Sequence, residues 1–250
     1  MAVHRAEALT WLDIRALDAA RTVAILPTGA LEAHGPHLPL ATDVVIAEAM
    51  VRDGAARLAA AGLEVLILPA VPYAPAPFAA AFPGTIDPPA AFITMLVTGI
   101  ARSLGAHGIR TLAIANAHHD PAQVAALRAV ATHAGDEAAQ VVFPDLTRRR
   151  WAERLTEEFR SGACHAGRYE GAVVLAERPE WVKAEVMQGL APNPRSLSDA
   201  IRHGKRTFDE AGGAEAYFGF PADATAGEGR AIVETLGAIL AEAVLEALPR

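Results

Sequence analysis

The sequence predicts an α/β fold in which a mostly parallel central sheet carries helices on both faces. Three observations support this prediction. The chain has 250 residues, of which 52% are hydrophobic, which is enough for the core of one α/β domain. Short runs rich in β-branched residues alternate along the chain with longer alanine-rich runs. The short runs are almost continuously apolar, which is typical of strands covered on both faces.

Four strands are predicted, at residues 22–29, 64–73, 109–117 and 139–146. Between them, helices are predicted at residues 45–61, 88–104 and 121–133. Glycine follows the first two helices and proline stands in the first turn of the second and third, as is common at helix ends and starts. Strands that alternate with helices in this way indicate parallel pairing through crossover connections.

The pattern becomes less regular after the last predicted strand. Residues 177–225 contain scattered prolines, so we expect loops and short helices packed at one edge of the molecule. A strong amphipathic helix is predicted at residues 228–248, whose apolar face carries Ile232, Leu236, Ile239, Leu240, Val244 and Leu248. Neither a repeat nor a low-complexity linker divides the sequence, so residues 1–250 are predicted to form a single domain.

The charge and cysteine content exclude several classes of function. A formal net charge of −7 argues against nucleic acid and anionic membranes as partners. The one cysteine, Cys164, excludes an internal disulfide and a cysteine-rich zinc module. The N-terminal stretch lacks the apolar run of a signal peptide, and no stretch resembles a membrane span. We therefore expect a cytoplasmic protein that acts on a small-molecule substrate.

Residues capable of metal binding or acid–base chemistry follow the predicted strands. The densest group lies in the segment GALEAHGPHLPLATDVV at residues 29–45, after the first strand. A proline-rich loop at residues 74–85 follows the second strand, NAHHD at 116–120 ends the third, and HAGRYE at 165–170 comes after the fourth. Ligands of open α/β sheets bind outside the carboxyl ends of the strands, so these groups are expected to meet at one edge.

The residue types and their spacing favour a metal site. Glu32 and His34 are separated by one residue, as are His118 and Asp120, and such pairs face the same side of an extended segment. Imidazole with carboxylate suits zinc, manganese, iron or cobalt, and several carboxylates suit two ions that share one of them. Two such ions could hydrolyse an amide or a lactone. A simpler alternative remains open from the residues alone: solvated loop histidines, with Asp43 as a helix N-cap.

Five segments resemble, in order and spacing, the motifs of the creatininase (creatinine amidohydrolase) family. The first is the most specific, and it matches the family signature almost position for position. The resemblance extends over residues 22–250, and its segments are GALEAHGPHLPLATD at 29–43, FPGT at 82–85, NAHHD at 116–120, HAGRYE at 165–170 and GFPADATAGEG at 219–229.

The resemblance implies a three-layer α/β/α sandwich, two divalent metal ions and a homo-oligomer, frequently a hexamer. The ions would be Zn, Mn or Fe. By the motif matches, one ion would be held by Glu32, Asp43 and His118. The other would be held by His34, Asp43 and Glu170, so that Asp43 bridges the two ions.

The resemblance also implies roles for residues beside the metals. His165 would be the acid–base residue that moves a proton to the leaving nitrogen. Asp120 stands where creatininase itself has a glutamate that steers a metal-bound water. Arg168 replaces a family glutamate, and its guanidinium could bind a substrate carboxylate or phosphate. His119 is expected to face the substrate mouth or a neighbouring subunit.

The substrate-lining motifs depart from the family more than the ligand positions do. Ala117 replaces a glycine, Pro121 replaces an asparagine, and FPDL at residues 143–146 lacks the tryptophan that covers creatinine. Creatinine itself is therefore not the expected substrate. The predicted activity is hydrolysis of a C–N bond in a cyclic amide or formamide, through attack by a metal-bridging hydroxide on the carbonyl.

Other functions remain as alternatives. One is hydrolysis of a lactone, a cyclic diketone or a short peptide on the same scaffold. Another is a non-catalytic metal-binding protein with the same fold. A nucleotide-binding α/β domain is disfavoured because PTGALEAHG after the first strand contains neither G-x-G-x-x-G nor a P-loop lysine.

Overall fold

The computed structural model describes residues 2–248, and within them a parallel sheet has five strands in the order β1-β3-β2-β4-β5. The central strands β2 and β4 are buried along their whole length, as the continuous apolar runs predicted. The strands are β1 (Val3–Arg5), β2 (Thr22–Thr28), β3 (Glu64–Ile67), β4 (Thr111–Asn116) and β5 (Gln140–Val142).

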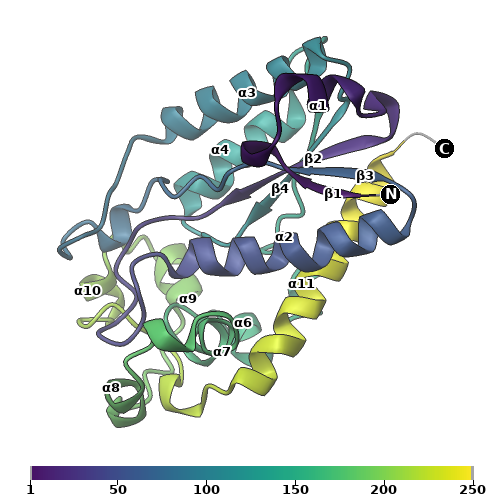
Figure 1. Ribbon diagram of the computed structural model, residues 1–250. Coiled ribbons are helices and arrows are strands. Elements are labelled where there is room, and N and C mark those ends of the chain that lie inside the picture. The colour runs from purple at the N-terminus through teal and green to yellow at the C-terminus, as the bar shows by residue number, and fades with distance from the viewer. Residues whose placement is uncertain (1, 249–250) are drawn as a thin grey trace.

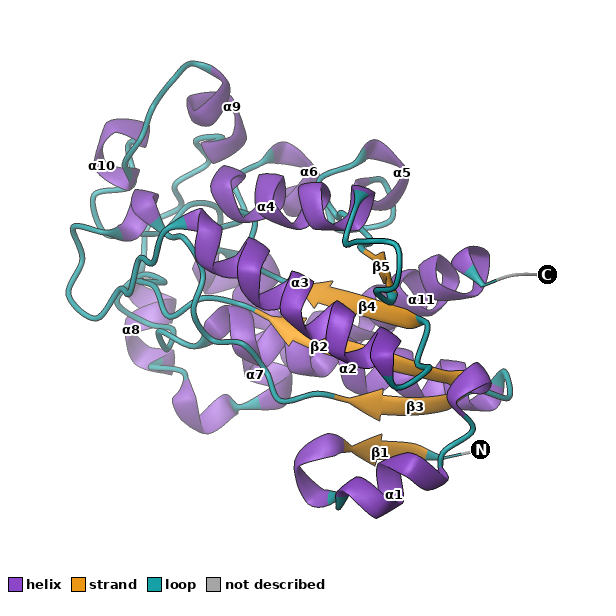
Figure 2. Cartoon of the chain, turned by 90° about the horizontal axis from the view of Figure 1, so that it is seen from above, coloured by secondary structure: helices purple, strands orange, loops and turns teal. Residues whose placement is uncertain are grey.

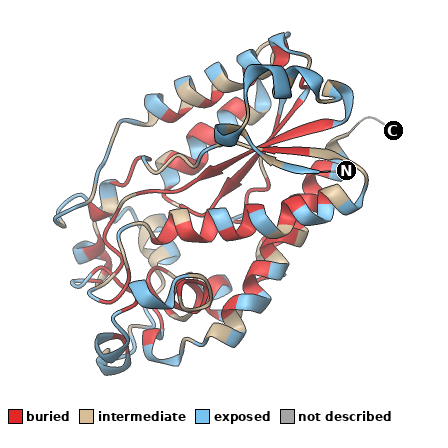
Figure 3. Ribbon diagram, in the orientation of Figure 1, coloured by how far each residue is buried: buried red, intermediate tan, exposed pale blue. Residues whose placement is uncertain are grey.

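Helices cover both faces of the sheet, which confirms the predicted three-layer α/β/α fold (Figure 1). One face packs against α2 (Thr42–Ala60) and α11 (Ala226–Ala247), and α7 (Arg168–Glu177) packs on these two helices. The other face packs against α3 (Ala90–Ala106) and α4 (Pro121–Thr132). Each interface is a separate cluster of buried apolar side chains, and the burial colours show the sheet enclosed between them (Figure 3).

The remaining elements are short and lie around this sandwich. Before β2 come η1 (Ala6–Ala8), α1 (Trp11–Ala16) and η2 (Ala19–Arg21), and η3 (Pro77–Ala79) lies in the proline-rich loop after β3. The excursion between β5 and α11 also contains α5 (Arg149–Ala152), α6 (Glu157–Ser161), η4 (Pro179–Trp181), α8 (Ala184–Gly189), α9 (Leu197–Arg202), α10 (Phe208–Ala211) and η5 (Pro221–Asp223). The loops and short helices expected for residues 177–225 are therefore observed.

The differences from the predicted elements have local causes. The second predicted strand is shorter than expected because Pro69 lacks the N–H that a continuing ladder requires. The fourth predicted strand is also shorter than expected, because Pro144 likewise lacks the N–H that a continuing ladder requires. Strand β1 was not predicted, since its three residues are too few to show a pattern. Within residues 2–248, no helix is long and apolar enough to cross a membrane.

The strand order places one crevice at the carboxyl ends of β2 and β4. From β2, the chain adds β3 on one side and β4 on the other, so the loops after β2 and β4 diverge at this point. Figure 2 shows the arrowheads of β2 and β4 pointing toward the end of the molecule where α8, α9 and α10 lie. The loops that carry the metal-binding candidates start here.

Candidate metal centre

The first predicted ligand set, which we call the strand trio, consists of Glu32, Asp43 and His118. The Nδ1 atom of His118 lies 3.1 Å from Glu32 Oε1 and 3.0 Å from Asp43 Oδ2. All three side chains are buried, and they offer ligand atoms within 4.8 Å of one another. Such a cluster of donor atoms can surround one cation.

The second predicted ligand set, which we call the helix trio, consists of His34, Asp43 and Glu170. His34 Nε2 lies 3.3 Å from Asp43 Oδ1 and 3.5 Å from Glu170 Oε2. Its three ligand atoms also lie within 4.8 Å of one another. Since the trios use different oxygens of Asp43, this carboxylate stands between them, in the position that a bridging ligand requires.

Hydrogen bonds fix the orientation of both trio histidines. His34 Nδ1 lies 3.1 Å from the Glu32 carbonyl oxygen, and His118 Nε2 lies 2.7 Å from the Pro75 carbonyl oxygen. A carbonyl oxygen can only accept, so these ring nitrogens carry the hydrogen and donate. The opposite nitrogens face the carboxylates, where each can give its lone pair to a cation once it loses its hydrogen, as metal-binding histidines do.

The chemistry of the donor set fits divalent cations. His34 Nε2 and Asp43 Oδ2 are buried and make no well-directed hydrogen bond among residues 2–248, although each lies near a trio partner. Burial disfavours a charged imidazole, yet Asp43, Glu170 and Glu32 raise the pKa of His34 to about 10. The three carboxylates therefore attract positive charge strongly. A cation bound within each trio would give the buried polar atoms a partner and would balance the negative charge.

The alternative role of Asp43 as a helix N-cap is wrong. Helix α2 starts at Thr42, its N-cap is Ala41, and Asp43 lies inside the first turn. Gly29, at the end of β2, allows this approach, because a Cβ there would come within 2.7 Å of Val44 N and 2.9 Å of Asp43 Cβ. The helix therefore carries Asp43 into the crevice.

The FPGT segment supports the loop that carries Glu32 and His34. The Thr85 hydroxyl accepts a hydrogen bond from the Ala33 N–H at 3.1 Å, and Ile86 donates its N–H to the Leu31 carbonyl at 2.9 Å. These bonds hold the loop open on both sides of Glu32. The motif therefore acts on the site through the backbone, without a side chain among the trios.

His165 lies beside both trios. Its Nε2 donates to the Ala33 carbonyl at 3.0 Å, which leaves the Nδ1 lone pair facing Glu32 Oε1 at 4.0 Å. Burial, together with the nearby His34, lowers the pKa of His165 to about 4, so the ring is neutral. A neutral ring with a free Nδ1 can accept a proton. Glu32, His34 and His165 also offer atoms within 4.8 Å of one another.

Asp120 and His119 both line the same pocket as the trios. Asp120 is the N-cap of α4, where its Oδ1 accepts from the Ala122 N–H at 2.7 Å, and burial raises its pKa to about 6. The His119 ring packs edge-on against Phe159, with centroids 5.5 Å apart. The structure therefore places both residues at the pocket and gives Asp120 a structural bond as well.

Arg168 is oriented differently from what a substrate contact requires. Its Nε and Nη2 atoms donate to Glu228 Oε1 at 3.0 and 2.9 Å. The side chains that line the pocket among residues 2–248 do not include it. Its predicted role in binding substrate has no geometric support in this conformation.

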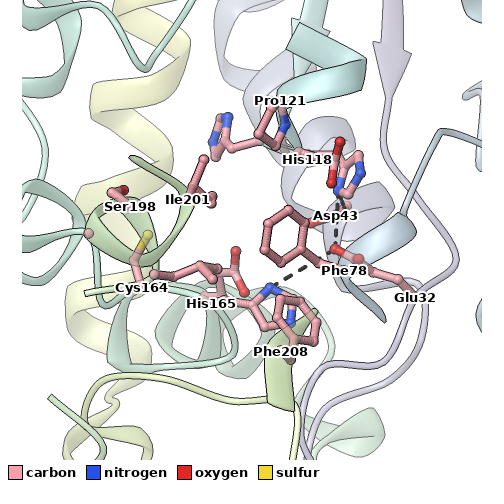
Figure 4. A pocket seen from close by; sticks show the side chains of 16 residues that line it. Glu32, Asp43, Phe78, His118, Pro121, Cys164, His165, Ser198, Ile201 and Phe208 are labelled. Carbon is pink, nitrogen blue, oxygen red and sulfur yellow. Dashed lines mark ion pairs between the residues drawn. The ribbon is translucent and has the colours of Figure 1, made fainter. Parts of the chain in front are cut away.

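The pocket combines a polar floor with an apolar wall. Its cavity volume is about 90 Å³, and Glu32, Asp43, His118 and Glu170 form part of its lining. Figure 4 shows Ile201 apart from Asp43 and Glu32, whereas Phe78 lies beside these acidic groups and Phe208 lies beside His165. The sequence placed the 74–85 loop, which carries Phe78, at this edge, but it missed Leu197, Ile201 and Phe208, because α9 and α10 carry no motif that marks them.

Comparisons with known proteins agree with the geometry. The family model for creatininase (creatinine amidohydrolase) matches residues 7–244. A mycofactocin precursor peptide peptidase from Mycobacterium tuberculosis is 33% identical over 220 residues, which span 83% of this chain and 78% of that protein. A creatinine amidohydrolase from Pseudomonas putida is 35% identical over 118 residues, which span 45% and 44%.

A solved structure of a creatininase mutant of the Zn-Zn type superposes with a TM-score of 0.75 at 25% identity, covering 98% of both chains. The match of the family model over nearly the whole chain and this shared architecture point the same way as the motifs. The chain is therefore a hydrolase of the creatininase family.

Proposed function

We propose that the protein is a divalent-metal-dependent amidohydrolase that cleaves the C–N bond of a small amide. The observation that carries this proposal is the pair of trios sharing Asp43, with the free Nδ1 of His165 facing them. The strand trio would hold one ion and the helix trio the other. When bound, such ions polarise a carbonyl and make water acidic enough to act as a nucleophile near neutral pH.

The side chains around the trios have distinct tasks in this reaction. The buried carboxylates of Glu32, Asp43 and Glu170 hold the ions and provide the negative charge that balances them. His165 takes a proton at Nδ1 and delivers it to the leaving nitrogen, while the Ala33 carbonyl keeps its Nε2–H in place. Proton transfer is thus confined to the ring nitrogen that faces the cavity.

The cavity favours a small, partly apolar substrate. Its lining includes the apolar side chains of Phe78, Leu197, Ile201 and Phe208 beside the trios. A cyclic amide or a formamide could place its carbonyl at the trios and its carbon skeleton on these side chains. Creatinine remains disfavoured because FPDL replaces the tryptophan segment.

A peptide bond is the second candidate. The Mycobacterium tuberculosis relative is named as a peptidase, and its similarity extends over 83% of this chain. The apolar wall could receive one side chain of a short peptide whose next amide lies at the trios. The peptide would then enter from the side of α9 and α10, which carry part of that wall.

The proposal is tested with protein stripped by a chelator and reloaded with Zn²⁺ or Mn²⁺. We expect hydrolysis of at least one substrate in a panel of cyclic amides, formamides and short peptides, only in the reloaded protein. Glu32→Gln should abolish turnover. Glu48→Gln, on the exposed face of α2, is the matched control and should have no effect. Turnover that survives chelation, or a fully active Glu32→Gln variant, would overturn the proposal.

A further inference from the structure

Glu158 is a buried carboxylate outside the two trios. It lies on α6 and is 6% exposed, and its oxygens accept backbone hydrogen bonds from two distant segments. Oε1 accepts from Arg168 N at 2.9 Å and from Phe220 N at 2.8 Å, and Oε2 accepts from Tyr169 N at 2.6 Å. Three charge-assisted bonds to backbone offset the cost of burying this charge.

Two glycines make room for the Glu158 carboxylate. A Cβ on Gly167 would lie 2.8 Å from both carboxylate oxygens, and one on Gly219 would lie 2.2 Å from Oε1. Gly219 also has a φ of +90°, a conformation that other residues rarely adopt. Both glycines belong to segments that resemble family motifs, HAGRYE and GFPADATAGEG. A Cβ would also meet the Phe218 carbonyl oxygen at 2.5 Å from Gly167 and the Ala163 carbonyl oxygen at 2.3 Å from Gly219, so glycine at both positions lets these backbone segments close around the carboxylate.

The backbone groups that donate to Glu158 lie next to a ligand residue of the candidate metal centre. Arg168 and Tyr169 are the first two residues of α7, and Glu170 of the helix trio is the third. Because the first N–H groups of a helix have no partner within the helix, an anion placed there fixes the direction of the first turn. Glu170 also bonds back to the Ala166 N–H at 2.6 Å, and Ala166 has the strained φ of +50°.

The second segment held by Glu158 supports the same turn from the other side. Phe218 donates its N–H to the His165 carbonyl at 2.8 Å, two residues before the Phe220 N–H reaches Glu158. The 165–170 turn therefore lies between α6 and residues 218–220, and Glu158 bonds to both. The Arg168 guanidinium makes its hydrogen bonds to Glu228, so Glu158 is held by the backbone N–H groups.

We propose that Glu158 is a positioning residue that sets the helix trio by fixing the first turn of α7, so that Glu170 reaches the ion shared with His34 and Asp43. This inference rests on the proposed function for the presence of the ions. The strand trio takes its residues from other segments, so Glu158 controls one ion and leaves the other almost unaffected.

The test compares Glu158→Gln with Glu157→Gln. The amide of a glutamine at 158 has one oxygen, so its NH₂ group must face at least one backbone N–H that the carboxylate now accepts. Glu157 is exposed on the same helix, and its replacement changes the net charge identically. Titrating metal-free protein with Zn²⁺ against a chromophoric chelator measures the two affinities separately.

We expect Glu158→Gln to weaken the binding of one ion by about 10- to 100-fold and the other by less than about threefold, the range seen for outer-sphere substitutions. Glu157→Gln should match the unsubstituted protein. Unchanged affinity for both ions in Glu158→Gln would overturn the inference. An equal loss of both would also overturn it, because that result indicates general destabilisation.

If Glu158→Gln does not fold, Glu158→Asp carries the same test, because it keeps the charge and shortens the reach by one methylene. Hydrogen exchange on metal-free protein separates the two proposals. If the unsubstituted protein binds no divalent ion, the proposed function fails. The proposed positioning role of Glu158 is then supported if its substitution accelerates hydrogen exchange in residues 166–171 and 218–221. Unchanged hydrogen exchange in these residues would overturn it.

Discussion

The two trios share one carboxylate but are held in place by different means. The strand trio is held close to the sheet: Glu32 follows β2, His118 follows β4, and the register pairs Thr28 with Asn116 at the strand ends. The helix trio depends on Glu170, which lies far along the chain on α7 and after a turn with a strained alanine. Its position is set by side-chain bonds such as those of Glu158.

The difference shows which half of the site tolerates change. Strand ends in a buried parallel sheet are fixed by many backbone bonds, so a single substitution nearby moves them little. The first turn of α7 has few such bonds and relies on a small number of buried polar contacts. We therefore expect most substitutions to affect ion binding at one trio and not at the other. Asp43 is the exception, because it belongs to both trios.

The largest effect is expected for Asp43→Ala, which removes the carboxylate that both trios use. Both ions should be lost, and activity should fall by about 10⁴-fold, since Lewis-acid stabilisation is worth several kcal/mol. Metal analysis and steady-state kinetics measure this, with Glu48→Gln on the same helix as the control. A variant that keeps one tightly bound ion would show that the trios are independent.

His165→Gln should separate proton transfer from metal binding. It removes the Nδ1 atom that faces Glu32, but no member of either trio. We expect a fall in kcat of about 10²-fold, within the range for general acid–base catalysis, with both ions retained. Loss of an ion in this variant would instead assign His165 to the third cluster, with Glu32 and His34.

The stability of the metal-free protein should depend on pH through His34. Despite its burial, the neighbouring carboxylates raise the pKa of His34 from 6.5 to about 10, so its protonated form stabilises the fold. This contribution is complete below pH 6.5 and is lost as the pH rises toward 10. Urea unfolding should show the decline in metal-free protein and a smaller one after metal loading. A metal-free His34→Gln protein with the same decline would contradict this assignment.

The smallest effect is expected for Arg168→Ala, which tests the predicted substrate contact. The Arg168 side chain is 38% exposed and pairs with Glu228 at 2.9 Å, so its loss should cost about 0.5 kcal/mol or less. Activity should change by less than about threefold, because the guanidinium does not line the pocket. A rise in KM of tenfold or more, with kcat unchanged, would place Arg168 on the substrate after a rotation of its side chain.

Much of the strand half could be predicted from the sequence. The apolar runs marked β2 and β4, and the motif after β2 marked Glu32, His34 and Asp43 as a group. Prediction was possible because these residues belong to one short motif that follows β2, and parallel strands end at one edge of a sheet. Whether Asp43 capped its helix could not be decided, since capping depends on where α2 begins, which is one residue earlier than Asp43.

The sequence alone determined the α/β class, the family resemblance and the residue types at the metal centre, because periodicity and motif spacing are local properties. Only the tertiary structure decided the apolar wall of the pocket, the orientation of Arg168 toward Glu228 and the role of Glu158. These features join segments far apart in the chain, such as Glu158 and Phe220. Their contacts depend on how the segment between β5 and α11 folds back, and no local sequence pattern predicts that path.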